Sequence, residues 1–223
     1  MIISVTKEEL ITLAIKQVDN LFLCDKETEV KAIAKDIPEA IERIEHCFSF
    51  SKCKYYQKNN DIFFNPFHSG QYAIFLYFLS RILSRENNSL ADKVYYLNKA
   101  LNSVDLYYEV EMPRIFDLDH PLGSVIGRAK FSDFFFFTQN CTVGNNNDIY
   151  PRFGENVTML SGATVIGNCK IGSNCIISAN TYIKDQDVPD NSIVFGSSPN
   201  LIIKQKEEAY FWENGMFNST GIS

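Results

Sequence analysis

Residues 153–184 read FGENVTMLSGATVIGNCKIGSNCIISANTYIK, and this stretch decides the fold. Apolar side chains recur in it at every sixth position, namely Phe153, Met159, Val165, Ile171, Ile177 and Ile183. Neither an α-helix nor an alternating strand produces a period of six. A coil with three flat faces does, because each face is a short strand and each corner is a tight turn. The stretch therefore predicts a left-handed parallel β-helix of hexapeptide repeats.

A second set of positions supports this interpretation. Four residues after each of the first five apolar residues stands a small or modest side chain: Val157, Ala163, Cys169, Cys175 and Thr181. Glycine and asparagine tolerate the left-handed conformations that the corners require. They occupy positions 154, 156, 162, 167, 168, 172, 174 and 180. Upstream, residues 125–144 carry a looser form of the same pattern. A solenoid with an apolar flank commonly forms a homo-oligomer, so we expect a trimer or a dimer of trimers.

Residues 1–108 have a different period and predict an α-helical domain. Apolar residues at helical spacing run from residue 5 to about 47, from Gln71 to Arg85, and from Leu90 to about Tyr108. Residues 53–67 predict a connection with a turn at Asn59-Asn60. We expect an α+β chain with an α-helical domain at 1–108, the β-helix at 109–204 and a tail at 205–223.

Composition excludes several classes of function. The chain has 21 basic and 27 acidic side chains, a net charge of −6, and no basic stripe, so nucleic acid is not an expected partner. It has no run of 18 apolar residues and begins without the pattern of a signal peptide, so we expect no membrane span and a cytoplasmic location. None of the six cysteines forms a C-x-x-C pair, and we expect no metal.

The three histidines, His46, His68 and His120, limit the candidate sites. A zinc-dependent carbonic anhydrase of this shape needs three histidine ligands, whereas the solenoid half holds only His120. A nucleotidyltransferase needs a glycine-rich nucleotide motif, which the first half lacks. His46 belongs to a predicted helix. His68 precedes an apolar helix, and its position is compatible equally with packing and with a role in a site. A non-catalytic scaffold remains an alternative.

The segment around His120 is similar to the serine acetyltransferase family. Residues 118–127, LDHPLGSVIG, match that family's Leu-Asp-His-x-x-Gly motif, and Val104-Asp105-Leu106 matches its Val-Asp-Ile fifteen residues upstream. Residues 138–144, 149–157 and 187–204 resemble later segments of the family. The resemblance covers about residues 60–204, weakly in the helical part.

This resemblance implies an acetyl-CoA-dependent O-acetyltransferase without a metal. His120 would be the general base, Asp105 would orient it, and Asp119 would face the acceptor. Coenzyme A would lie between two solenoids, along a set of positions comprising Gly144, Ser161, Gly162, Ala179 and, for its phosphates, Lys204.

Two departures from the family concern the acceptor. The family's Arg-His pair, which holds a carboxylate, is replaced by Ile149 and Tyr150, and its Asp-Pro-x-x-Asp is replaced by residues 65–69. An unpaired carboxylate in a site is costly. We therefore expect a saccharide or sugar nucleotide as acceptor, bound by Asp119, Tyr150, His68 and Asn145, in surface polysaccharide biosynthesis. The alternative is serine O-acetylation in cysteine biosynthesis.

Overall fold

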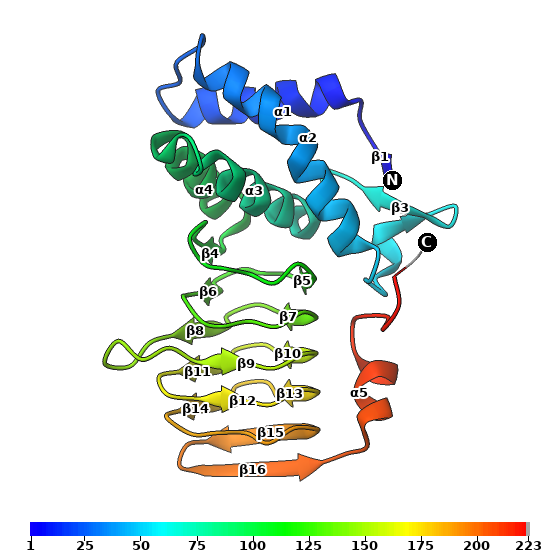
Figure 1. Ribbon diagram of the computed structural model, residues 1–223, viewed down its shortest axis with the longest axis vertical. Helices are drawn as coiled ribbons and strands as arrows, with labels where there is room; N and C mark the ends of the chain where they lie inside the picture. Colours follow the sequence, from blue (N-terminus) through cyan, green and yellow to red (C-terminus); the bar gives the residue numbers. More distant parts are fainter. Residues whose placement is uncertain (222–223) are drawn as a thin grey trace.

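The computed structural model describes residues 1–221. Figure 1 shows a layer of helices at one end of the molecule and a column of stacked coils beneath it. The four helices of the layer are α1 (Lys7–Leu21), α2 (Glu29–Phe48), α3 (Ser69–Leu83) and α4 (Asn88–Asn102). The α+β class and the helical N-terminal part are therefore confirmed.

Local signals explain where these helices begin. At α1, Thr6 and Glu9 form a capping box, in which each residue's side chain accepts a hydrogen bond from the other's backbone N–H. Helix α3 is buried on nearly every side because α2 and α4 pack against it. Helix α4 ends earlier than the expected Tyr108, because Ser103 adopts a left-handed conformation with φ of 53°.

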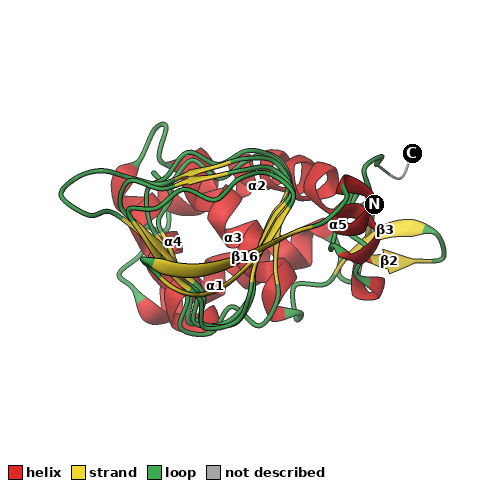
Figure 2. Ribbon diagram, turned by 90° about the horizontal axis from the view of Figure 1, so that it is seen from below, coloured by secondary structure: helices red, strands yellow, loops and turns green. Residues whose placement is uncertain are grey.

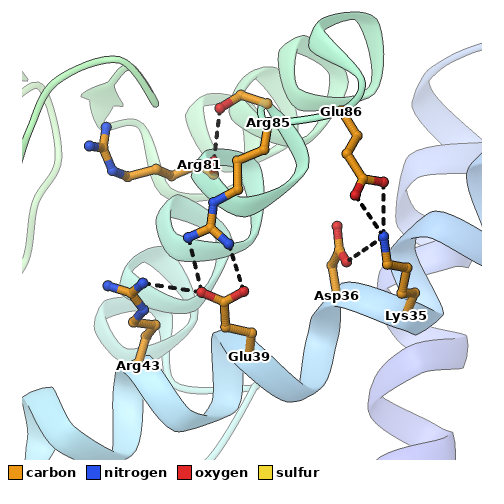
Figure 3. Close-up of polar contacts among 8 residues, drawn as sticks. Lys35, Asp36, Glu39, Arg43, Arg81, Arg85 and Glu86 are labelled. Atoms are coloured by element: carbon orange, nitrogen blue, oxygen red, sulfur yellow. Dashed lines mark hydrogen bonds and ion pairs between the residues drawn. The ribbon is translucent and has the colours of Figure 1, made fainter.

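An exposed cluster of charges joins α2 to the C-terminal end of α3 (Figure 3). The carboxylate of Glu39 accepts hydrogen bonds from Arg43, one turn along the same helix, and from Arg85. Lys35 pairs with Glu86 at 2.8 Å. Exposed pairs of this kind each add about 0–1 kcal/mol, so the apolar contact between the helices contributes most of the stability.

The segment expected as a connection contains regular structure. A 3-10 turn (Lys54–Tyr56) leads into a hairpin of β2 (Gln57–Lys58) and β3 (Asp61–Phe64), and β1 (Ile2–Ile3) pairs with β3 in parallel. The hairpin turns at Asn59 and Asn60, which both have positive φ, as the sequence predicts.

The coils form a parallel β-solenoid with strands on three faces. The first face holds β4 (Asp105–Leu106), β6 (Val125–Ile126), β8 (Thr142–Gly144), β11 (Thr164–Ile166) and β14 (Tyr182–Lys184). The second face holds β5 (Phe116–Leu118), β7 (Phe135–Phe137), β10 (Val157–Met159), β13 (Cys175–Ile177) and β15 (Ser192–Ser197). The third holds β9 (Arg152–Phe153) and β12 (Lys170–Ile171), and β16 (Asn200–Gln205) pairs antiparallel with β15. Strand β4 places the first solenoid residues at 105–106, slightly before the expected boundary at 109.

The register confirms the six-residue period. Val157 pairs with Cys175 and Thr164 with Tyr182, eighteen residues apart, so three repeats make one coil. The six apolar positions from Phe153 to Ile183 are each at most 3% exposed. At one corner Asn156, Asn174 and Asn191 all have positive φ, and their side chains form a ladder of 3.0 Å hydrogen bonds.

The tail after β16 folds back along its own chain. Figures 1 and 2 show helix α5 (Glu208–Asn214) beside the column of coils, on the path from the last coil to the helical layer. Trp212 and Phe217 pack against Phe134 of the second face, and Phe217 pairs with Ser51. This side of the solenoid is therefore covered by the chain itself. Within residues 1–221, no helix is both long and apolar enough to cross a membrane.

Candidate active site

His120 lies at a corner of the solenoid, between β5 and β6. Its φ is 47°, and its carbonyl accepts a 2.7 Å hydrogen bond from the N–H of Leu122. Gly123, with φ of 72°, is required here, because a Cβ would lie 2.4 Å from Oδ1 of Asn140 in the next coil. The His120 side chain is 79% exposed. The Leu-Asp-His-Pro-Leu-Gly segment thus builds a tight turn that presents the imidazole to solvent.

Asp119 is the carboxylate beside His120. Its Oδ1 lies 3.6 Å from Nε2 of His120, which is beyond hydrogen-bond length and within ion-pair distance. Among residues 1–221, no other carboxylate lies within ion-pair distance of His120.

Asp105 has other partners in this structure. Its Oδ1 accepts a 2.7 Å hydrogen bond from the Tyr95 hydroxyl, and its Oδ2 lies 2.5 Å from the ammonium of Lys99. Both partners come from α4. Burial and then the Asp105 contact raise the pKa of Tyr95 to about 12. The structure therefore does not join Asp105 to His120, and the role of Asp105 as orienter stays a prediction.

His68 is brought to the His120 corner from the helical domain. It caps α3, with its Nδ1 accepting a 3.3 Å hydrogen bond from the N–H of Gln71. At Gly70, an added Cβ would lie 3.3 Å from the carbonyl of Leu118, so the start of α3 abuts the end of β5. Burial lowers the pKa of His68, and the nearby Asp119 partly opposes that shift. A neutral His68 with Nδ1 as acceptor carries its proton on Nε2, where it can donate to an acceptor molecule.

The loop with Asn145 and Tyr150 lies at a different corner. It projects between β8 and β9 (Figure 1), and Asn147 and Asp148 form its turn with positive φ. Five residues of extended chain, about 16 Å, separate this edge of the first face from the edge at Asn140, below the His120 corner. Of the predicted acceptor residues, the structure brings Asp119 and His68 to His120 within one protomer, but not Asn145 or Tyr150.

The positions predicted to bind coenzyme A also lie at different edges of the solenoid. Ser161, Gly162 and Ala179 belong to the column of corners below His120, where backbone hydrogen bonds join each coil to the next. Gly144 lies at the opposite edge. Lys204 is on β16, with its ammonium 5.4 Å from the centre of the Phe195 ring.

The two glycines among these positions, Gly162 and Gly144, are explained by different constraints. Gly162 has φ of 73°, and a Cβ there would lie 2.4 Å from Oδ1 of Asn180, so the fold itself requires glycine. Gly144 has no positive φ, and its Cβ would meet only Cγ2 of Ile166 at 3.6 Å, an ordinary contact. Since the fold does not require glycine at 144, its bare backbone is the better candidate for ligand contact.

Sequence reasoning missed a buried carboxylate near His120. Asp117, at the centre of β5, is 3% exposed and accepts hydrogen bonds from Tyr56 and Ser51. The signal available in the sequence was an acidic residue inside the apolar run of residues 115–118.

Comparisons with known proteins agree with this geometry. Residues 150–185 match the bacterial transferase hexapeptide (six repeats) family. A serine acetyltransferase of Staphylococcus aureus (strain Mu50) is 27% identical over 155 residues, covering 62% of this chain and 67% of that protein. One from Staphylococcus epidermidis (strain ATCC 12228) is 26% identical over 156 residues, covering 62% and 67%.

Solved structures share the fold. A serine acetyltransferase in complex with cysteine aligns with a TM-score of 0.70 at 19% identity, covering 96% of this chain and 86% of that one. One in complex with CoA aligns with a TM-score of 0.64 at 18% identity, covering 89% and 84%. The repeat is similar to that of bacterial hexapeptide transferases, and the fold is that of the solved serine acetyltransferases. The chain is also similar in sequence to serine acetyltransferases within that class.

Proposed function

We propose that this protein transfers the acetyl group of acetyl-CoA to the hydroxyl of L-serine, with His120 as general base. The observation that carries the proposal is the Leu-Asp-His corner, which exposes an imidazole beside Asp119 and His68. The similarity to serine acetyltransferases favours serine, the alternative of the sequence analysis, and with it a place in cysteine biosynthesis. No relative described above supports a role in polysaccharide biosynthesis.

The proposed reaction needs one base and no covalent enzyme intermediate. Neutral His120 accepts the hydroxyl proton while the oxygen attacks the thioester carbonyl. The new carbon–oxygen bond forms, the carbon–sulfur bond breaks, and the imidazolium returns the proton to the leaving thiolate. Asp119, at 3.6 Å, stabilises the imidazolium. A backbone amide near Gly144 is the proposed donor to the oxyanion.

The proposed site is shared between protomers. Within one chain, the His120 corner and the Gly144–Tyr150 loop lie on opposite edges of the first face, so one solenoid cannot bring them together. A neighbouring copy can present its loop to this corner. Exposed Leu122 and Val125 on the same face support such packing. The expected particle is a trimer of the 25.5 kDa chain, or twice that, measured by light scattering.

One observation favours a second acceptor class. Residues 144–150 carry no cation and include Asp148 and an exposed Ile149, so this loop offers nothing to pair with a carboxylate. A sugar hydroxyl needs no such partner, and Tyr150 offers an aromatic face to a sugar ring. The second candidate is therefore O-acetylation of a saccharide.

An acetyl-CoA consumption assay against L-serine and a panel of sugars tests both candidates. Turnover of L-serine supports the first, whereas turnover of sugars alone overturns it in favour of the second. Turnover with neither overturns both. His120→Ala should lower kcat by roughly 10²–10⁴-fold, and His46→Ala, in α2, is the control that should leave kcat unchanged.

A further inference from the structure

The carboxylate of Asp117 lies between the helical domain and the strand that leads into His120. Its Oδ1 accepts a 2.8 Å hydrogen bond from the Tyr56 hydroxyl and a 2.7 Å bond from the N–H of Leu118. Its Oδ2 accepts a 2.9 Å bond from the Ser51 hydroxyl. Ser51 and Tyr56 follow α2, more than sixty residues before Asp117. A single side chain thus fastens β5 to a distant part of the chain.

The position of Asp117 within its face is unusual. The strand register aligns it with Phe136, Thr158, Ile176 and Ile193 in the coils below. Asp117 is the only ionisable member of this outward column, and it stands in the coil that carries His120. An apolar side chain is sufficient for packing in this column, as at Phe136 one coil below, which packs in a cluster with Phe134 and Phe217. Packing therefore does not explain a carboxylate at this position.

The carboxylate is held by neutral donors. Burial raises the pKa of Asp117 to about 6, and its hydrogen bonds to Tyr56, Ser51 and Leu118 oppose that shift. Four titratable groups face this carboxylate. They are Cys47 of α2, Cys53 and Tyr56 of the segment after α2, and Asp119, which follows β5. None of these is a cation. At neutral pH the protein therefore maintains a buried negative charge with no cationic partner, which costs stability.

We propose that Asp117 is a positioning residue of the active site, which fixes the Asp119–His120 corner against the helical domain. This inference rests on the proposed function. After His120, the corner is held by a backbone hydrogen bond from the N–H of Gly123 to the carbonyl of Ser103. Before His120, Cys47 also contacts β5, by a 2.8 Å hydrogen bond to the carbonyl of Phe116. Asp117 is the side-chain anchor closest to His120, three residues away.

The consequence for rate follows from geometry. A general base acts only within hydrogen-bond reach of the proton it accepts, and an error of about 1 Å can cost about a hundredfold. If β5 loses its anchor, His120 and Asp119 move together relative to His68, which belongs to α3. Binding of acetyl-CoA depends on coils further down the solenoid and is not expected to change.

The test is Asp117→Asn, which keeps the shape and removes the charge. The amide oxygen can still accept from Tyr56 and Leu118, so the fold should persist. The Ser51 hydroxyl, however, meets an N–H in place of its acceptor, and the two remaining bonds are no longer charge-assisted, so the anchor weakens. We expect kcat to fall about tenfold to a hundredfold, with KM for acetyl-CoA unchanged. Tyr56→Phe should lower kcat in the same direction, and the double variant should lose less than the product of the two effects. Thr158→Val, two coils below in the same column, is the matched control.

Stability separates positioning from a purely structural role. At pH 8 the Asn variant no longer buries a charge, so its melting temperature should equal or exceed that of the unmodified protein while its kcat falls. An unchanged kcat, or a loss of kcat that follows the loss of folded protein, would overturn the proposal.

A readout independent of turnover keeps the two proposals distinguishable. The imidazole resonances of His120 should shift in Asp117→Asn and stay in place in Thr158→Val. If the unmodified enzyme acetylates no hydroxyl, the proposed function fails, while these resonances still report whether Asp117 sets the position of His120. Unshifted resonances overturn the positioning role whatever the activity is.

Discussion

The ammonium of Lys99 lies 2.5 Å from Oδ2 of Asp105. Asp105 occupies the position predicted to orient His120, and in this structure Lys99 holds that carboxylate. Lys99 stands in the last turn of α4, six residues before Asp105, and Tyr95 binds the other carboxylate oxygen. The pair connects the end of the helical domain directly to the first strand of the solenoid.

Lys99→Met should leave the carboxylate of Asp105 without its ammonium partner, so that Oδ2 can accept a hydrogen bond from the imidazole that Asp105 is predicted to orient. If Asp105 orients His120, kcat should rise severalfold, up to about tenfold, in an acetyl-CoA consumption assay. Lys35→Met, which breaks a comparable exposed pair with Glu86, is the control. A kcat identical to that of the unmodified enzyme would contradict the predicted role of Asp105.

Stability should depend on pH through Asp117. Its pKa in the folded protein, about 6, lies above the ordinary 3.8, so the folded state holds this proton more tightly than the unfolded state. The contribution of Asp117 to stability is therefore fully present below about pH 4 and declines as pH rises to about 6. Compared with Asp117→Asn, the unmodified protein should lose on the order of 2–3 kcal/mol across this window. Urea unfolding of both proteins at several pH values measures the difference, and parallel curves would contradict it.

Alanine substitutions at Gly162 and Gly144 should distinguish a glycine that the fold requires from one that the proposed cofactor site requires. Gly162→Ala should destabilise the protein by about 1–3 kcal/mol, because of its positive φ and the contact with Asn180. Gly144→Ala should leave the melting temperature nearly unchanged while KM for acetyl-CoA rises, because the added methyl group covers the backbone. An unchanged KM in Gly144→Ala would remove Gly144 from the proposed cofactor site.

The asparagine ladder should contribute measurably to stability. Asn174 donates to Asn191 and accepts from Asn156, and it holds a φ of 54°. Asn174→Ala should cost about 2–3 kcal/mol, from lost hydrogen bonds and the strained conformation. Asn168→Ala, at an exposed position without positive φ, should cost far less in the same thermal unfolding experiment. Equal losses would show that the ladder adds nothing.

The features that could be predicted from sequence are local ones. The six-residue period assigns Phe153 to Ile183 to the interior, because each coil repeats one pattern of inward and outward side chains. The same local logic explains why the corners hold glycine and asparagine. The outer bounds of the predicted helical stretches came within a few residues, except at Ser103, whose left-handed conformation ends α4 early. The sequence did not predict the break that divides residues 5 to about 47 into α1 and α2.

The rest was decided by contacts between distant segments. Tyr56 and Asp117 are 61 residues apart, and no pattern in either segment predicts the hydrogen bond between them. Trp212 and Phe217 of the tail pack against Phe134, about eighty residues earlier in the chain, and the sequence predicted only a tail at 205–223.

The sequence by itself determined the repeat, the motif that contains His120 and the family resemblance, since these depend on residues close along the chain. Only the tertiary structure decided what surrounds His120: His68 of α3 beside it, the buried Asp117 behind it, and the Gly144–Tyr150 loop at the far edge of the face. The physical reason is that hydrogen bonding and burial depend on proximity in space, which a periodic sequence specifies within a coil but not between the solenoid and the domain that caps it.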